Sequence, residues 1–423
     1  MLNTSLSSPA PEITLERPSG TAGSDPYRWV VVAVLLLAVL TAFFDRINVA
    51  VLFSNGEFRE ALGITSPAMM GLLMSSFVFA YGASALFLSF SSDMFGPRRT
   101  LSLITLVLAV GMALMGSVTS YTAMLAGRVV LGVAEGPQFG SANVAVKRWF
   151  MPGERGFATS LWTVGAPLGS MIGFPLIIFL VAQYGWRASF YLLAALNGLI
   201  VLPAVWLLLR DNPNKSRSAP IPALAGETLP FRTAIGLLLG NGGFWLLAIY
   251  DCGAMIYLWG LNSWLPTYLT QARHFDVAHS ALFSSLPFLF MLGGSFFGGW
   301  LGDRLKSRAA ICLLGLLLAG VAILGATYVE DATHAALLLA LSAGLWGMTV
   351  PTLFAMGTEI IPGKVTALGF GVYAGIANLV GAAAPLLMGI LIGQSGNYTQ
   401  GLMVIVVSCV VLSFAMLPLL RRH

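Results

Sequence analysis

Charged residues are scarce in this sequence. Asp, Glu, Lys and Arg make up 9% of its 423 residues, whereas hydrophobic residues make up 57%. Soluble domains carry about 25% charged residues. A chain of this length has too much apolar surface for a water-soluble fold, so we expect lipid to surround most of it. The net charge of +5 is typical of Lys and Arg stored in cytoplasmic loops, so it predicts no nucleic-acid partner.

Cysteine and histidine are also scarce, which excludes several kinds of chemistry. The three cysteines lie in separate apolar segments: Cys252, Cys312 and Cys409. The four histidines fall in predicted loops or at the C-terminus: His274, His279, His334 and His423. Neither set has the spacing of a metal site, and the sequence contains no nucleophile elbow. We therefore expect no disulfide framework, no metal, no cofactor and no enzymatic activity.

Long apolar segments are abundant. A bilayer core of about 30 Å needs about 20 apolar residues per helix. On that basis the sequence predicts an all-α polytopic membrane protein with twelve transmembrane helices. The predicted spans are 29–53, 68–91, 99–118, 121–147, 155–181, 187–209, 240–269, 280–302, 308–328, 334–357, 366–392 and 400–420.

Polar stretches divide the chain. Residues 1–28 lack the basic and apolar regions of a signal peptide, so we expect a disordered cytoplasmic tail. Residues 210–239 are rich in Pro and Ser and are expected to form a cytoplasmic linker between two six-helix bundles, at 29–209 and 240–423. Most Lys and Arg fall on the same side as the N-terminus, which predicts that both termini are cytoplasmic in a multi-pass protein of the inner (plasma) membrane.

The two halves share a short loop motif. The segment SFSSDMFGPRR follows the second predicted span, and GWLGDRLKSR follows the eighth. The residues of the motif are Asp93, Gly96, Arg98 and Arg99 in the first copy and Gly299, Asp303, Arg304 and Arg308 in the second. A repeat at matching places in each half is typical of a transporter built from two parallel bundles.

Five charged residues lie well inside predicted spans: Asp45 and Arg46 in the first, Arg128 and Glu135 in the fourth, and Asp251 in the seventh. Each charge at the centre of a bilayer costs about 2.5–3.5 kcal/mol on insertion scales. Arg128 and Glu135 are two helical turns apart, so they share one face of a helix. We expect that face to line the interior of the bundle, where each charge offsets the desolvation of another. A static ion-pair network that holds helices together is the alternative.

With these features the chain resembles the major facilitator superfamily, and within it the anion:cation symporter family. The likeness rests on the spans, the linker and the loop motif, and on the segments FFDRINVAVL and GRVVLGVAEGPQFGSANVAVKRWFMPGER. It implies that Asp45 and Glu135 carry the coupling proton and that the loop motifs latch the cytoplasmic gate. The first motif departs from the superfamily pattern at Ser89 and Met94, which implies a weaker latch.

Several residues are candidates for substrate contacts. Arg46 and Arg128 are natural forked partners of a carboxylate. The other candidates are Tyr81, which the resemblance implies, together with Trp162, Asp251 and Asn378. Each has a second interpretation: packing for the two aromatic residues, a helix–helix hydrogen bond for Asn378, and an extra proton site or simple solvation for Asp251.

Apolar side chains at several places indicate the substrate class. Relatives that carry sugar acids tend to have hydrogen-bonding side chains where this chain has Phe43, Trp162, Ala166 and Ala374. Unpaired substrate hydroxyls would be costly there. A sugar acid stays possible, but the pattern favours a less hydroxylated carboxylate, either aromatic or short and aliphatic.

The sequence thus predicts a secondary transporter that couples uptake of a small organic anion to protons by alternating access, working as a monomer. An exporter or proton antiporter of the same fold is one alternative, and a non-transporting membrane receptor is another. The glycine rows of the fifth span (Gly165, Gly169 and Gly173) and of the eleventh are expected where the two bundles meet.

Overall fold

The computed structural model describes residues 25–88, 91–151, 153–211, 231–305, 307–362 and 365–420. The predicted tail at 1–28 and the predicted linker at 210–239 lie largely outside these ranges. Within them, all regular secondary structure is helical. Residues 231–239, at the end of the predicted linker, form a helix, α11 (Phe231–Leu239), which packs through Ala234 and Leu238 on the second bundle.

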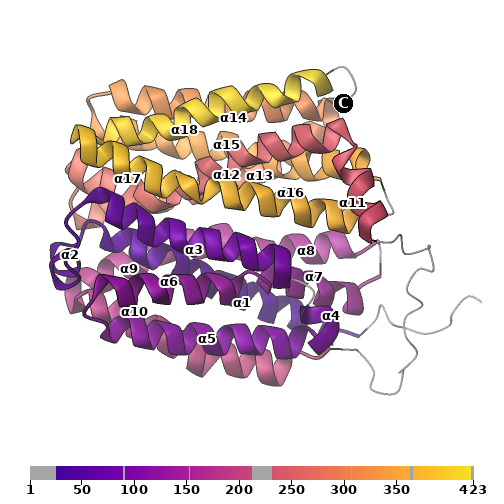
Figure 1. Ribbon diagram of the computed structural model, residues 1–423, viewed down its shortest axis with the longest axis horizontal. Coiled ribbons are helices and arrows are strands. Elements are labelled where there is room, and N and C mark those ends of the chain that lie inside the picture. Colours follow the sequence, from indigo (N-terminus) through magenta and orange to yellow (C-terminus); the bar gives the residue numbers. More distant parts are fainter. Residues whose placement is uncertain are drawn as a thin grey trace, which may run out of the picture.

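The helices form two bundles that lie side by side (Figure 1). The N-terminal bundle contains α1 (Tyr27–Leu52), α2 (Gly56–Ala61), α3 (Pro67–Leu88), α4 (Ser91–Phe95), α5 (Pro97–Ser117), α6 (Tyr121–Glu135), α7 (Gln138–Trp149), α8 (Arg155–Thr163), α9 (Gly165–Tyr184), α10 (Trp186–Leu196), η1 (Asn197–Val201) and η2 (Ala204–Leu208). The C-terminal bundle contains α11, α12 (Gly242–Thr267), η3 (Tyr268–Ala272), α13 (Val277–Leu305), α14 (Arg308–Tyr328), α15 (Ala332–Ile360), α16 (Thr366–Gly381), α17 (Ala383–Ser395), α18 (Tyr398–Ser413) and η5 (Phe414–Leu419).

Eleven helices in the described ranges are long and apolar enough to cross a membrane, against twelve predicted spans. The difference is the fourth span, which consists of two shorter helices, α6 and α7. They meet at Gly136 and Pro137, and proline has no N–H with which to continue a helix. The break falls directly after Glu135, so the fourth predicted span is interrupted at one of its two buried charged residues.

Side-chain caps fix where several helices begin. Asn55, Asn241 and Asn397 accept hydrogen bonds from backbone N–H groups at the starts of α2, α12 and α18. Asp331 does the same for α15, where its Oδ1 lies 2.7 Å from the backbone nitrogen of His334. This hydrogen bond lowers the pKa of the Asp331 carboxyl group. Such caps satisfy N–H groups that have no partner within the helix.

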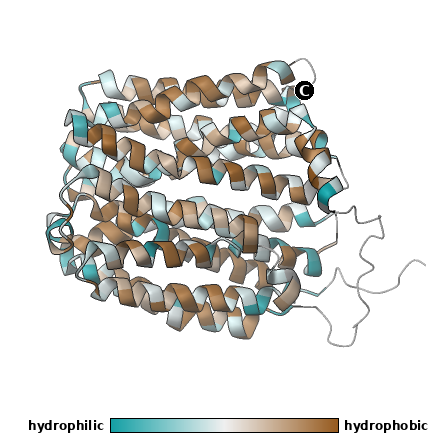
Figure 2. Ribbon diagram, in the orientation of Figure 1, coloured by the Kyte–Doolittle hydropathy of each residue, from teal (hydrophilic) through white to brown (hydrophobic). Residues whose placement is uncertain are grey.

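Hydrophilic residues gather at the two ends of the molecule, and hydrophobic residues cover the helices between them (Figure 2). Large apolar side chains such as Phe79, Phe179 and Phe296 are more than half exposed along the spans. Exposure of this kind is expected where lipid, rather than water, is the solvent. We call the end where Asp211 and Phe231 flank the linker the linker end, and the opposite one the far end.

The bundles meet along two seams. In the first, α3 packs on α16 and α17, and added Cβ atoms at Gly71 and Gly389 would collide with the facing backbones. In the second, α9 packs on α13, where the rings of Phe174 and Phe288 stack with centroids 5.5 Å apart. At the far end the rings of Phe53 and Trp264 lie 5.4 Å apart across the two bundles. The linker-end half of the fifth span, α8, packs mainly on α1 and α7.

The expectation for the glycine row of the fifth span is wrong. Added Cβ atoms at Gly165, Gly169 and Gly173 would meet α1, which belongs to the same bundle. The row therefore serves close packing inside the N-terminal bundle, while another face of α9 meets α13. In the eleventh span, Gly375 faces Leu86 of the N-terminal bundle, as expected. Gly369 and Gly381 instead face Ile361 and Met255 of their own bundle, so the expectation is wrong for them.

Candidate transport site

Small residues bring α3 and α6 very close together. A Cβ at Gly132 would collide with the backbone of Phe77, and one at Gly136 would lie 2.5 Å from the backbone nitrogen of Ala85. The spacing of these two glycines is the one that favours close helix contact in membranes. As a result α6 lies directly on α3, and both charged residues of α6 point into the bundle, where Arg128 and Glu135 are each 0% exposed.

A direct ion pair joins the first span to the fourth. The Nε of Arg46 donates to Oε2 of Glu135 at 2.6 Å, and Arg46 is 3% exposed. Its guanidinium carbon also lies 4.5 Å from the ring centroid of Phe43 and 4.6 Å from that of Tyr81. The ring of Phe139 lies somewhat further away, at 5.9 Å. The guanidinium is therefore held by one carboxylate and screened by aromatic faces, which attract a cation.

Asp45 has a different partner, in the sixth span. The amide nitrogen of Asn197 donates to Oδ2 of Asp45 at 2.8 Å, and both residues are buried. Asn197 begins η1, a π-helical turn, and such turns are frequent at functional sites. Sequence reasoning missed Asn197, although a lone amide within the apolar stretch LLAALNGLIV was a signal that could have found it.

Arg128 is held by backbone and sulfur. Its Nε donates to the carbonyl oxygen of Leu73 at 3.2 Å, and its Nη2 lies 3.3 Å from the sulfur of Met74. Its guanidinium carbon lies 4.3 Å from the ring centroid of Phe77. Asp45, Arg46, Arg128 and Glu135 are close enough to interact electrostatically with one another. The structure thus brings four of the five charges predicted inside spans into one cluster, which we call the charge cluster.

The charge cluster keeps unused hydrogen-bonding atoms. Nη2 of Arg46, Nη1 of Arg128, Oε1 of Glu135 and Oδ1 of Asp45 are buried and have no hydrogen-bond partner in the described part of the chain. Buried polar atoms in folded proteins normally have partners, since each unpaired one costs about 1–3 kcal/mol. Two guanidinium groups with a free N–H each are suited to bind an anion, and two carboxylates with a free oxygen each are suited to bind a proton.

The C-terminal bundle faces this cluster with neutral residues. Tyr81 lies next to Trp259 of α12, with ring centroids 6.2 Å apart. The indole nitrogen of Trp259 donates to Oδ1 of Asn378 at 3.0 Å, and the amide nitrogen of Asn378 donates to the carbonyl of Ala374. Two of the predicted contacts, Tyr81 and Asn378, therefore lie where the bundles meet. Tyr81 is one of the rings that cover Arg46.

Two other predicted contacts lie further away. Trp162 is 0% exposed and its ring packs on Phe139, whose other neighbour is the guanidinium of Arg46. Asp251 lies on α12 about 12 Å from Trp259 along the helix, by the rise per residue. Its electrostatic neighbours are Tyr250, Cys252, Cys312 and Tyr373, all in the C-terminal bundle. The structure does not bring Asp251 into the charge cluster.

The two loop motifs at the linker end differ in their contacts. In the first, Asp93 lies in α4, Gly96 has a φ of 84°, and the backbone nitrogen of Arg98 donates to Oδ1 of Asp211 at 2.9 Å. Asp211, which also lies 4.0 Å from Arg148, was not predicted as part of this loop.

In the second motif, Gly299, Asp303 and Arg304 belong to the continuous helix α13, and Asp303 is exposed. The guanidinium of Arg304 lies over the ring of Trp300. Arg308 pairs with Glu359 of α15. The described helices of the two copies end at equivalent positions, Phe95 and Leu305. The copies differ instead in their partners, because the first contacts Asp211 and the second contacts Glu359.

Two helical bundles side by side, one of which buries a cluster of opposite charges, are the architecture of a secondary transporter. Residues 35–385 match the Major Facilitator Superfamily, to which the chain belongs. The chain is 30% identical to a probable sulfoacetate transporter of Cupriavidus necator, over 89% of this chain and 90% of that protein. It is 24% identical to the D-galactonate transporter of Escherichia coli, over 89% and 92% respectively.

A solved structure has the same fold. It is a bacterial homolog of the human lysosomal transporter Spinster, 20% identical, with a TM-score of 0.80 over 95% of this chain and 98% of that one. These comparisons confirm the resemblance to the superfamily and to its anion transporters, the multi-pass membrane location and the helical fold. They also confirm that the chain is a transporter and not an enzyme.

Proposed function

We propose that this protein takes up a small organic anion together with protons. The observation that carries the proposal is the hydrogen bond between Arg46 and Glu135 inside the N-terminal bundle. As long as Glu135 is ionised, it occupies the guanidinium that an anionic substrate needs. A proton on Glu135 weakens that bond and leaves Arg46 free for the substrate. Proton and anion are then bound together because Glu135 and the substrate compete for one cation.

The unused atoms of the charge cluster support this function over a static ion-pair network. A pair that only holds helices together gains stability when its remaining donors and acceptors are satisfied. Here Arg46, Arg128, Asp45 and Glu135 each keep a buried atom without a partner among the described residues. Asp45 is the second candidate for carrying a proton, as the family resemblance implies, and Asn197 would orient it.

The surroundings of Arg46 favour a substrate with few hydroxyl groups. Its guanidinium is flanked by the rings of Phe43 and Tyr81, which offer little hydrogen bonding beyond one phenol. Across the bundle boundary, the side chains of Trp259 and Asn378 already bond one another. A relative that is a probable sulfoacetate transporter agrees with a short, doubly anionic substrate. We therefore infer a short carboxylate, with or without a sulfonate, as the substrate class.

The contacts between bundles fit an alternating-access cycle. Ring pairs such as Phe53 with Trp264 close the far end, and α8 packs on its own bundle at the linker end. If the linker end is cytoplasmic, as the basic residues predict, this state faces inward. The two loop motifs at the linker end would latch the opposite state. The hydrogen bond from Arg98 to Asp211 is present in this state, and it would hold the first loop in position for that latch.

Uptake by purified protein in sealed proteoliposomes tests the proposal. We expect sulfoacetate or a related short carboxylate to accumulate above its outside concentration when the outside is more acidic than the inside. Collapse of the pH gradient with a protonophore should remove accumulation and leave exchange of bound anion across the membrane. The variant Glu135→Gln keeps the shape of the side chain and cannot ionise, so it should exchange the anion without accumulating it.

Other outcomes would identify the alternatives. Accumulation driven in the reverse direction would indicate an exporter or proton antiporter. Anion binding without any transport by the wild-type protein would indicate a receptor. Uphill uptake by Glu135→Gln at the wild-type level would remove Glu135 from proton coupling.

A further inference from the structure

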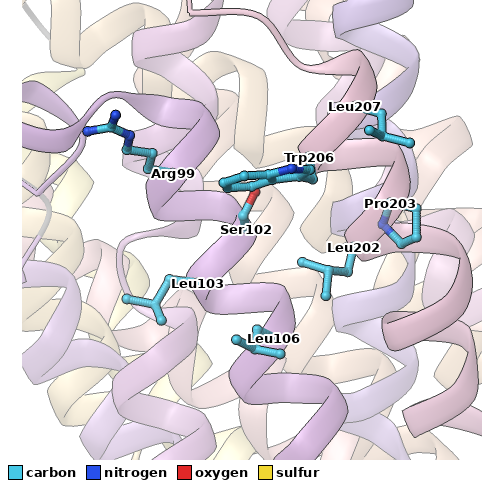
Figure 3. Close-up of a pocket in the computed structure, with 8 residues that line it drawn as sticks. All are labelled: Arg99, Ser102, Leu103, Leu106, Leu202, Pro203, Trp206 and Leu207. Carbon is cyan, nitrogen blue, oxygen red and sulfur yellow. The ribbon is translucent and has the colours of Figure 1, made fainter.

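An apolar groove lies on the membrane-facing side of the N-terminal bundle, away from the charge cluster. It has a volume of about 520 Å³ and runs between α5 and the end of the sixth span. Its lining is Arg99, Ser102, Leu103, Leu106, Leu202, Pro203, Trp206 and Leu207 (Figure 3). Leu103 and Leu207 are both more than 60% exposed, so no other part of the described chain covers the groove.

A basic pocket adjoins the groove at the linker end. It has a volume of about 490 Å³, and its lining includes Arg98, Arg99, Arg148 and Asp211. Arg99 and Trp206 belong to both sites, so the groove and the pocket are continuous. Arg98 lies over the ring of Trp206, and Arg148 is 4.0 Å from Asp211. Three guanidinium groups thus face a single carboxylate, and the pocket keeps an excess of positive charge.

The depth of these residues matches the shape of a phospholipid. Arg99 lies in the first turn of α5, at the linker end, and Leu106 lies about 10 Å further along the helix by its rise per residue. A ligand seated here would place an anionic group at the membrane surface and an apolar chain along the leucines. Basic residues beside a membrane surface attract anionic lipids, by about 1 kcal/mol each.

We propose that the groove and the basic pocket together bind one anionic phospholipid, with its headgroup phosphate at Arg98, Arg99 and Arg148 and an acyl chain against Leu103, Leu106 and Leu202. The charge of the pocket selects an anionic headgroup over a zwitterionic one. The bound lipid would compete with Asp211 for Arg148 and so act on the first loop motif. This inference does not depend on the transported substrate.

Native mass spectrometry of the delipidated full-length protein tests the proposal. We expect phosphatidylglycerol to bind more tightly than phosphatidylcholine of the same chain length. Arg99→Gln should weaken phosphatidylglycerol binding about fivefold, in line with the loss of one basic residue. Arg187→Gln is the matched control, because Arg187 lies over the ring of Trp186 at the far end. It should bind phosphatidylglycerol as the wild type does.

A second variant tests the groove itself. Leu106→Trp fills the groove from an exposed position, so it should fold and should weaken phosphatidylglycerol binding while inorganic phosphate binding stays unchanged. Equal affinity for the two lipids, or no effect of either Arg99→Gln or Leu106→Trp, would overturn the proposal. Displacement of phosphatidylglycerol by millimolar glycerol phosphate would also overturn it, because the acyl chain would then contribute nothing.

Discussion

The two bundles share a fold and differ in where they place charge. The N-terminal bundle buries two carboxylates and two guanidinium groups close enough to interact electrostatically with one another, together with Asn197. At the matching boundary, the C-terminal bundle presents Trp259 and Asn378, which are neutral and bonded to each other. Its buried carboxylate, Asp251, lies closer to the linker end and has no ion-pair partner among the described residues.

Under the proposed mechanism, this difference would separate proton coupling from gating. Arg46 and Glu135 belong to one bundle, so their bond persists when the bundles move relative to each other. The proposed competition between Glu135 and an anion for Arg46 would then work in the same way whichever side is open. The contact of Trp259 with Tyr81 crosses the boundary, so it would change when the bundles rock. The N-terminal bundle would therefore set what binds, and the C-terminal bundle would sense that it has bound.

The largest effect is expected from the loss of the shared cation. Arg46→Gln removes the group for which Glu135 and the anion compete and leaves a buried carboxylate unpaired. Loss of one partner of a buried ion pair costs on the order of 3 kcal/mol, which corresponds to about a hundredfold in affinity. We expect anion binding, measured by isothermal titration calorimetry, to fall by at least this factor.

Arg46→Lys distinguishes charge from geometry. It keeps the positive charge and loses the planar fork, so its affinity should lie between those of Arg46→Gln and the wild type. Wild-type affinity in Arg46→Gln, with a normal melting temperature, would contradict the view that the N-terminal bundle sets binding.

A smaller effect is expected at the second arginine. Arg128→Lys cannot keep the bonds to both the Leu73 carbonyl and the Met74 sulfur while it offers an N–H to the anion. We expect about tenfold weaker anion binding by calorimetry, because a lysine has no second arm to form a forked contact. The control is Arg28→Lys. Its partner Glu154 is a half-exposed residue at the linker end of the same bundle. It should bind the anion within about twofold of the wild type.

Much of this comparison could be predicted from the sequence. Hydrophobic runs of membrane length predict spans directly, and a charge in lipid must face inward, so the burial of Arg128 and Glu135 followed from their spacing. The break in the fourth span was harder to predict. A proline can either kink a helix or end it, and the sequence alone does not say how α6 continues into α7 beyond Pro137. Residue spacing along one helix also gives no partner on another helix.

Contacts between distant segments were out of reach for this reason. The sequence contains Asn197, Asp45 and Asp211, but it does not say that the sixth span lies beside the first or that the linker reaches the first loop motif. The glycine row of the fifth span illustrates the same limit. Its spacing predicts close packing correctly, but two neighbours were available, and the row packs on α1 rather than on the other bundle.

The hydrogen bond between Trp259 and Asn378, at the boundary between the bundles, gives a further prediction. Asn378→Leu leaves the buried indole N–H of Trp259 without its acceptor, at a cost of about 1–3 kcal/mol. We expect uptake to slow several-fold with little change in anion affinity. The double variant Asn378→Leu with Trp259→Phe removes both partners and should recover part of the rate, as a double-mutant cycle would reveal. Additive losses would show that the hydrogen bond is not what matters at this boundary.

The smallest effect is expected at Asp251, and this variant bears most directly on the comparison. Asp251→Asn removes a buried carboxylate that pairs with no basic side chain in the described ranges, so stability should not fall and the melting temperature should stay level or rise. Because Asp251 lies outside the charge cluster, anion affinity should stay within about twofold of the wild type, since no bond to the anion is lost. Loss of proton-driven accumulation in this variant would place a proton site in the C-terminal bundle. Coupling would then be shared between the bundles rather than confined to one, and Asp251 would have to communicate with Glu135 through the rocking motion itself.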